Sequence, residues 1–201
     1  MLVGVNKSIN EQLEVLEEIL MKSEKIVNVL KILESYALEN KDFSNYYLSA
    51  GCINQTIFNY YHDFELDYGI KDFDIVYFDK DVSYEKEDII IKDLEKLLKD
   101  IDMEFDIKNQ ARVYIWYKEK YGVERVPYSS VEDAISSWGA TITCIGVRLE
   151  NGKLKVCCPY GLNDIFSMTV RSVKREFTKE QYEIRAKRWK DKWNKLNIKE
   201  W

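Results

Sequence analysis

The stretch from Ile70 to Phe78, IKDFDIVYF, organises the chain because it places two acidic residues inside an apolar, β-prone run. Side chains alternate between the two faces of a β-strand, so Asp72 and Asp74 share one face while Phe73 takes the other. Two neighbouring carboxylates repel each other, and a divalent cation is their natural partner. The pattern indicates a strand that carries a metal or catalytic site.

The same Asp-x-Asp spacing recurs twice, so it is not specific by itself. Asp79/Asp81 follows the strand and Asp100/Asp102 closes a charged helix, and both are positions where solvated turn residues are expected. Only Asp72/Asp74 lies inside the hydrophobic run. At this point the alternative that this pair is also a chance product of an acidic composition stays open.

Composition limits the class of protein. The 201 residues include 46% hydrophobic residues and only two prolines, which predicts a single domain over residues 1–201 with one sizeable core. The formal net charge of -5 argues against a general electrostatic nucleic-acid binder, so nucleic acid is the less favoured partner. No apolar stretch approaches the ~20 residues that span a bilayer, and no signal-peptide pattern is present. We expect a cytoplasmic protein without a membrane partner.

Cysteine and histidine usage disfavours two kinds of chemistry. Cys52, Cys144, Cys157 and Cys158 have no C-x-x-C spacing, and His62 is the only histidine. A zinc site and a His-based catalytic triad are therefore disfavoured, and reduced thiols in core strands are expected.

Hydrophobic periodicity predicts the remaining elements. Two helices, from Ile9 to Met21 and onward from Ser23, form an N-terminal helical extension over residues 1–45. The further elements expected are a strand at 46–50, a helix from 51, a helix at 83–98, a strand at 103–108, a helix from 109, a short helix after Ser130 with Trp138 on its face, strands at 141–149 and 153–158 around an Asn151-Gly152 hairpin turn, a strand or helix at 165–171 and a helix at 178–196.

Two of these elements bear on the candidate site. The 103–108 strand puts Glu104 and Asp106 on one face, so a third acid could lie beside the first pair. The Ala50-Gly51-Cys52 junction between strand and helix could turn backbone N–H groups toward an anion. A tight packing turn is the alternative at this junction. The basic, aromatic 178–196 helix is expected to dock its tryptophans onto the domain rather than to bind nucleic acid.

Five blocks in this order resemble the nucleotidyltransferase superfamily typified by DNA polymerase beta, and more closely a little-characterised bacterial family of nucleotidyltransferases. The blocks are Ala50–Asn54, Lys71–Asp79, Lys108–Arg112, Gly146–Arg148 and Pro159–Asp164, followed by Lys187-Arg188-Trp189 with Trp193. The resemblance spans residues 46–198. It implies an α+β fold with a mixed central sheet flanked by helices, N-terminal helices and a C-terminal helix.

The resemblance also implies an activity, namely transfer of a nucleoside monophosphate from an NTP to an unidentified small-molecule or protein acceptor. Asp72, Asp74 and Asp106 would hold two Mg²⁺ ions, and Asp106 could accept the acceptor's proton. The residues expected to contact the nucleotide are Gly51 and Cys52 through their backbone N–H groups, Asn54, and, by charge alone, Lys108, Arg112 and Arg148.

The sequence departs from the superfamily pattern at Cys52, where a second Gly or a Ser is usual, and in the long interval from Gly51 to Asp72. A second hypothesis therefore remains open, in which the same fold is a non-catalytic module that binds a nucleotide or a protein.

Overall fold

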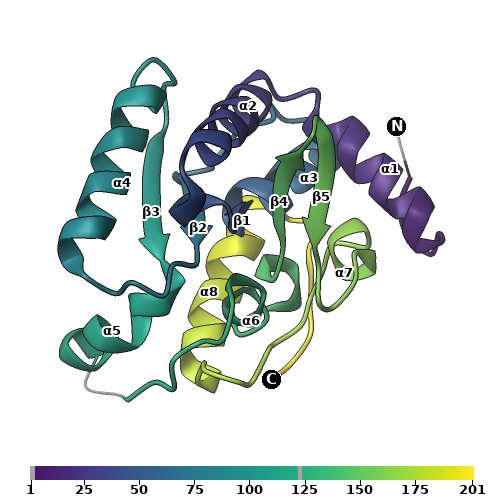
Figure 1. Ribbon diagram of the computed structural model, residues 1–201. Coiled ribbons are helices and arrows are strands. Elements are labelled where there is room, and N and C mark those ends of the chain that lie inside the picture. The colour runs from purple at the N-terminus through teal and green to yellow at the C-terminus, as the bar shows by residue number, and fades with distance from the viewer. Residues whose placement is uncertain (1–2, 122–123) are drawn as a thin grey trace.

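A five-stranded mixed sheet forms the centre of the computed structural model, which describes residues 3–121 and 124–201 (Figure 1). Its strands are β1 (Tyr46–Ser49), β2 (Asp72–Tyr77), β3 (Glu104–Asn109), β4 (Gly146–Glu150) and β5 (Lys153–Cys157), in the spatial order β3-β2-β1-β4-β5. The β2–β3 pair is parallel and the other pairs are antiparallel. The expected α+β architecture with a mixed sheet is confirmed.

Helices surround this sheet. They are α1 (Ile9–Leu20), α2 (Glu24–Glu39), α3 (Gly51–His62), α4 (Tyr84–Leu98), α5 (Val113–Tyr121), α6 (Val131–Ile135), α7 (Asn163–Phe166) and α8 (Lys179–Lys192), with short 3₁₀ helices η1 (Lys41–Phe43), η2 (Gln110–Arg112) and η3 (Thr141–Thr143). A small parallel pair of β6 (Thr169–Val170) and β7 (Asn197–Ile198) lies near the C-terminus. No helix in the described ranges is long and apolar enough to cross a membrane.

The two N-terminal helices begin where their capping residues predict. Ser8 and Glu11 form a reciprocal capping box at α1, and the Ser23 hydroxyl accepts from the Ile26 N–H at α2. Leu16 on α1 and Leu30 on α2 are fully buried, and both belong to the hydrophobic cluster that includes the sheet. The N-terminal extension therefore packs into the same core as the strands.

The β2–β3 pair has an apolar face and an acidic face. Phe73 and Phe105 are partners in the register, and their rings meet edge to face at a centroid distance of 6.0 Å. Helix α4 connects the two strands and buries Ile90, Leu94 and Leu98. Alternation then turns the intervening acids toward the other face, which is the face that carries the candidate site.

The strand predicted at 141–149 is wrong in its first part. Residues 141–143 form η3 instead of the first part of a strand, because the Thr143 N–H and hydroxyl both donate to the Ala140 carbonyl, at 3.0 and 2.8 Å. The strand begins at Gly146. The hairpin turn itself is confirmed, since Asn151 and Gly152 both have positive φ, 54° and 71°, as a two-residue type I′ turn requires.

Smaller differences occur at other element ends. The helix predicted from 109 opens as η2 before α5, and the predicted end at Gly122 lies outside the described residues. Trp138 lies beyond α6, segment 165–171 is divided between α7 and β6, and α8 ends at Lys192. All four cysteines are free thiols, with Cys52 and Cys144 buried and Cys157 and Cys158 half-buried.

Candidate functional site

The parallel register of β2 and β3 brings the predicted acids together. Asp74 is the partner of Asp106 and Asp72 is the partner of Glu104, so all four acids lie on one face of the sheet. Asp72, Asp74 and Asp106 line a cavity of about 390 Å³, whereas Glu104 does not line it. The three predicted acids therefore lie on the wall of one cavity in the described structure.

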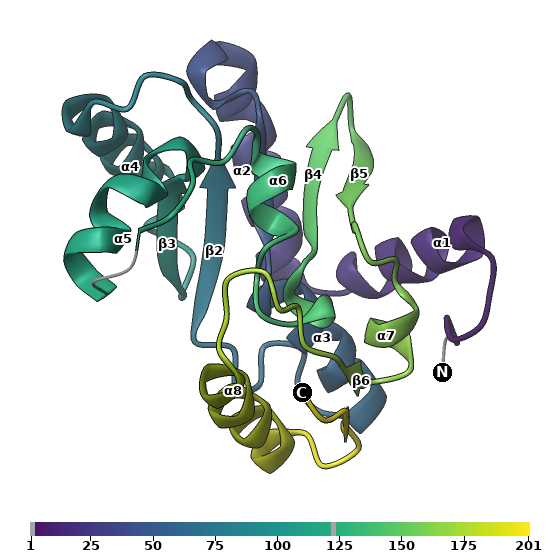
Figure 2. The ribbon, with the colours of Figure 1, turned by 90° about the horizontal axis from the view of Figure 1, so that it is seen from below.

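Besides the acidic strands, Trp138 and Thr143 line this cavity, together with four segments. They are the start of α3 with Ala50, Gly51 and Gln55; the region of η2 and α5 with Gln110, Val113, Trp116 and Tyr117; the segment with Arg125 and Tyr128; and the α8 region with Phe177, Gln181, Arg185, Arg188 and Trp189. In Figure 2, α5 lies to the left of β2 and α8 lies below it. The cavity thus joins an acidic sheet face to basic and aromatic side chains.

Asp74 lies in the least favourable electrostatic position of the three acids. Burial is the largest cause that raises its pKa, to about 7, and repulsion from Asp72 and Asp106 adds to it. Among the side chains of residues 3–118 and 124–201, no ion pair joins Asp72 or Asp74 to a lysine, arginine or histidine. A bound cation would relieve this strain, because an opposite charge nearby favours the ionised carboxylate.

Asp106 already has a cationic neighbour. The Lys108 ammonium, two residues along β3 and on the same face, donates to Asp106 Oδ2. Accordingly, no three Asp, Glu, His or Cys side chains in the described ranges converge as a ready-made metal group. The donor chemistry nevertheless fits Mg²⁺, which is generally bound by one or two carboxylates together with water and substrate phosphates.

The turn that leads into α3 is strained. Ala50 adopts φ 56° and ψ -120°, a region that is comfortable only for glycine, and it makes no side-chain cap for the helix. A backbone conformation of this kind persists only where the surrounding structure holds it in place, and such positions cluster at functional sites. The first N–H groups of an α-helix have no intrahelical partners, and Ala50 and Gly51 line the cavity.

The Gln55 side chain covers Gly51. A Cβ at this position would lie 2.7 Å from Gln55 Nε2, so the Gln55 amide folds over the first turn of α3. Cys52 turns its thiol inward, where it donates to the Ser49 carbonyl at 3.2 Å, and burial raises its thiol pKa. Cys52 is fully buried and does not line the cavity.

Besides Cys52, three residues predicted to contact the nucleotide do not line the cavity. Asn54 is buried and donates to the Ile142 carbonyl at 2.9 Å, which fastens α3 to η3. Arg112 pairs with Glu87 of α4 at 2.6 Å. Arg148 lies over the Tyr47 ring, with its guanidinium carbon 4.8 Å from the ring centroid.

The sequence reasoning missed Gln55, Arg125, Arg185 and Arg188, which do line the cavity. Spacing offers a signal for part of this set, since Gln181, Arg185 and Arg188 recur at i, i+4 and i+7 and so share one face of a helix. For Arg125 no signal in the sequence was available.

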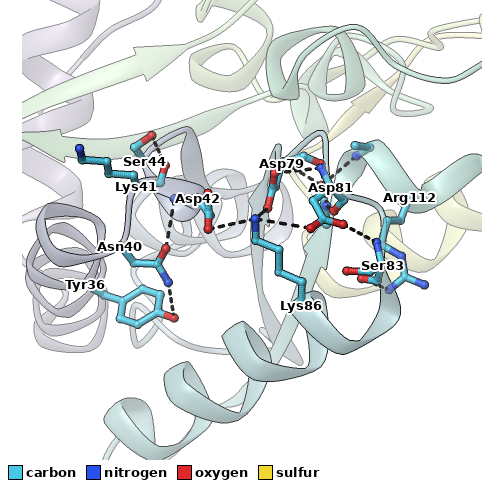
Figure 3. Close-up of polar contacts among 12 residues, drawn as sticks. Tyr36, Asn40, Lys41, Asp42, Ser44, Asp79, Asp81, Ser83, Lys86 and Arg112 are labelled. Atoms are coloured by element: carbon cyan, nitrogen blue, oxygen red, sulfur yellow. Dashed lines mark hydrogen bonds and ion pairs between the residues drawn. The ribbon is translucent and has the colours of Figure 1, made fainter.

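The second acidic pair has a structural role at the other end of β2. Figure 3 shows the Lys86 ammonium between Asp42, Asp79 and Asp81, at 2.9, 2.8 and 3.8 Å from their carboxylates. The Asp81 N–H donates to Asp79 Oδ1, and Asp81 in turn accepts from the Ser83 N–H, both at 3.0 Å. The pair therefore stabilises a turn, as expected.

A strained strand-to-helix turn beside an acidic pair on β2 and a third acid on parallel β3 defines the polymerase beta-like nucleotidyltransferase fold. A family model described as "Nucleotidyltransferase" matches residues 36–198, so the chain belongs to this nucleotidyltransferase family. The match begins at Tyr36 within α2, earlier than the boundary at residue 46 expected from the sequence blocks.

A solved structure supports the same assignment. The protein described by the words "The NMR structure of the protein reveals a CCA-adding enzyme head domain" is similar to this chain, with 28% sequence identity and a TM-score of 0.73. The similarity covers 94% of this chain and 96% of that one. The comparison with curated proteins gives no match.

Proposed function

We propose that the protein is a Mg²⁺-dependent nucleotidyltransferase, which transfers a nucleoside monophosphate from an NTP to a small-molecule or protein acceptor. The observation that carries the proposal is the meeting of Asp72, Asp74 and Asp106 in one cavity beside the N-terminus of α3. Family membership supports the reaction class. The chain's negative net charge makes nucleic acid the less favoured acceptor.

Asp72 and Asp74 are the residues that would hold Mg²⁺, with Asp106 completing the group on the acceptor side. When bound, Mg²⁺ supplies positive charge that offsets the negative charge of the reacting phosphates. Asp74 is suited to this role because its carboxylate is held close to Asp72 and Asp106 at an energetic cost.

The chain's own groups account for the remaining steps. The acceptor hydroxyl oxygen forms a bond to the α-phosphorus while the bond from that phosphorus to the bridging oxygen breaks, and pyrophosphate leaves with the bonding electrons. The Asp106 carboxylate accepts the hydroxyl proton. The N–H groups of Gly51 and Cys52 bind phosphate oxygens at the helix N-terminus, and Lys108 binds the same phosphates through its charge.

The second candidate function is nucleotide binding without turnover. The observation in its favour is the contact of Lys108 with Asp106, which occupies the third acid with an internal cation. This alternative predicts that nucleotides bind while no phosphoryl group moves.

Label transfer separates the two functions. The purified protein is incubated with Mg²⁺, a panel of acceptors and an NTP labelled either at the α- or at the γ-phosphate. A nucleotidyltransferase moves the α-label and never the γ-label. Movement of the γ-label would indicate a kinase instead, and binding of nucleotide with no transfer to any acceptor, including the protein itself and cell extract, would favour the binding module.

The third acid can be tested with a matched pair on β3. Asp106→Asn is expected to lower α-label transfer by about 10²-fold or more, because it removes the proton acceptor. Glu104→Gln, one alternation away and outside the cavity, is expected to stay within a few-fold of wild type. Damage by Glu104→Gln alone would mean that the acid on β3 has been assigned incorrectly.

A further inference from the structure

Helix α8 carries two different stripes along its length. Its core stripe consists of Tyr182, Ala186 and Trp189, continued by Trp193 at the C-cap, and all of these side chains are buried. Beside it, Gln181, Arg185 and Arg188 recur at i, i+4 and i+7 and line the acidic cavity. The helix therefore does more than cover the core.

The core stripe holds α8 in a defined position relative to the site. The Trp193 indole N–H donates to Asn59 Oδ1 on α3 at 2.7 Å. The Tyr182 hydroxyl lies 3.0 Å from the Val170 carbonyl and 2.7 Å from the Lys199 carbonyl. Because α3 also begins at the cavity with Gly51, one helix fixes both the phosphate-facing turn and the arginine-bearing wall.

Arg188 differs from two other cations of the cavity. Lys108 is paired with Asp106, and Arg125 is paired with Glu176 at 2.5 Å. The Arg185 guanidinium carbon lies 4.4 Å from the Phe177 ring centroid, and this stacking orients the guanidinium plane. Arg188 makes no ion pair with any residue in the described part of the chain.

Charge also links α8 to the acidic strands. Arg185 of α8 and Asp74 of β2 line the same cavity. An anion bound between β2 and α8 would therefore lie within electrostatic range of both walls. Arginine is well suited to such a position, because its planar set of N–H donors binds phosphate oxygens in pairs.

We propose that Arg185 and Arg188, supported by the Gln181 amide, form a second phosphate-binding wall that contacts the β- and γ-phosphates of the donor nucleotide. The proposal rests on the nucleotidyltransferase function proposed above and specifies where its polyphosphate lies. Since these two phosphates leave as pyrophosphate, the arginines stabilise charge that develops on the leaving group as well as binding the ground state. Both kcat and KM for the NTP should then depend on them.

The direct test uses inorganic tripolyphosphate, which has no base or sugar, as the titrant in calorimetry with Mg²⁺ present. Arg185→Gln and Arg188→Gln are each expected to weaken binding by about tenfold, as expected for loss of hydrogen bonds between charged groups. The matched control is Lys187→Gln, which removes the same charge from an exposed position between them that does not line the cavity. It should change affinity by less than about twofold, because Lys187 does not line the cavity and its loss removes no direct contact with the polyphosphate.

Further measurements exclude a merely structural effect. Equal urea midpoints for the variants and wild type would show that α8 remains docked. Arg188→Lys should recover only part of the affinity, because lysine keeps the charge but not the paired donors. Two results would overturn the proposed wall: an equal loss of tripolyphosphate affinity in Lys187→Gln and Arg188→Gln, or full recovery of that affinity in Arg188→Lys. Either would show that only the overall positive charge matters.

The outcome for the wall can be separated from the outcome for the function. If wild type transfers the α-label and the Arg185→Gln/Arg188→Gln double variant does so with unchanged kcat and KM, the wall is wrong and the transferase stands. If wild type neither transfers the label nor binds NTP or tripolyphosphate, the proposed function is wrong and the wall with it. Transfer by wild type with a raised KM and lowered kcat in the double variant alone supports both.

Discussion

Two Asp-x-Asp pairs, one at the start of strand β2 and one just after its end, have the same spacing but different surroundings. Asp72 and Asp74 begin the strand on its cavity face, and among the side chains of residues 3–118 and 124–201 no cationic group forms an ion pair with either. Asp79 and Asp81 follow the strand, where Lys86 forms ion pairs with both carboxylates and backbone N–H groups donate to one oxygen of each. The spacing of two acids in the sequence therefore says little about their role. The cations and N–H donors that surround their carboxylates indicate it better.

The largest expected difference between the pairs is in activity. Asp74→Asn should lower Mg²⁺-dependent α-label transfer by on the order of 10³-fold, since it removes a carboxylate that would hold the metal and contribute several kcal/mol of charge stabilisation. Asp81→Asn should stay within about twofold, because an exposed turn residue has no contact with the reacting groups. Steady-state rates at saturating NTP measure both, and equal rates for the two variants would break the comparison.

For the free energy of unfolding, we expect the surroundings of Asp79 and Asp81 to matter more than those of Asp72 and Asp74. Asn109 is buried and joins the second pair to β3, because its Oδ1 accepts from the Asp79 N–H and its Nδ2 donates to the Asp79 and Asp81 carbonyls. Asn109→Ala should lower the unfolding free energy by about 3 kcal/mol, since several buried partners lose their hydrogen bonds. Urea denaturation measures this change.

The exposed Asn197 provides the control for that variant. Asn197→Ala is expected to change the unfolding free energy by less than about 0.5 kcal/mol. If the two alanine variants were equally stable, the turn around Asp79 and Asp81 would not depend on the buried amide, and its structural role would need another explanation.

The smallest effect concerns the charge of Asp81. Hydrogen bonds from Ser83 lower the pKa of this carboxyl below its usual 3.8. A carboxyl with a lowered folded-state pKa adds stability above the unfolded-state pKa, and that stability is lost as the pH falls through the folded-state value. Wild type should therefore be slightly more stable than Asp81→Asn at neutral pH, and the gap should close below pH ~3.8. If the stability difference between wild type and Asp81→Asn persisted in acid, it would not come from the charge of Asp81.

The sequence predicted the acidic strands well because a period of two leaves few alternatives for a run such as Ile70–Phe78. It could not supply the register of β3 on β2, which depends on how α4 packs across residues far apart in the chain. The third acid was therefore expected from alternation and resemblance, and only the fold placed it beside Asp74.

Charge alone was a poor guide to the phosphate-facing residues. Arg112 and Arg148 were selected for their charge, yet each is held by local partners, Glu87 in the first case and the Tyr47 ring in the second. The arginines of α8 were overlooked because the tryptophans on the same helix account for its docking. A helix that serves a core and a cavity carries two superimposed patterns, and the stronger apolar one conceals the other.

Strand β3 lies at the edge of the sheet, bonded to β2 alone, while β2 has neighbours on both sides. Edge strands open locally at lower free energy than inner strands, so amide hydrogen exchange should be faster in β3 than in β2. Each opening separates Asp106 from Asp74 while the Asp72/Asp74 pair stays in place. The complete acidic group is thus present only while the edge is closed, and a ligand that bridges the two strands would slow exchange throughout β3.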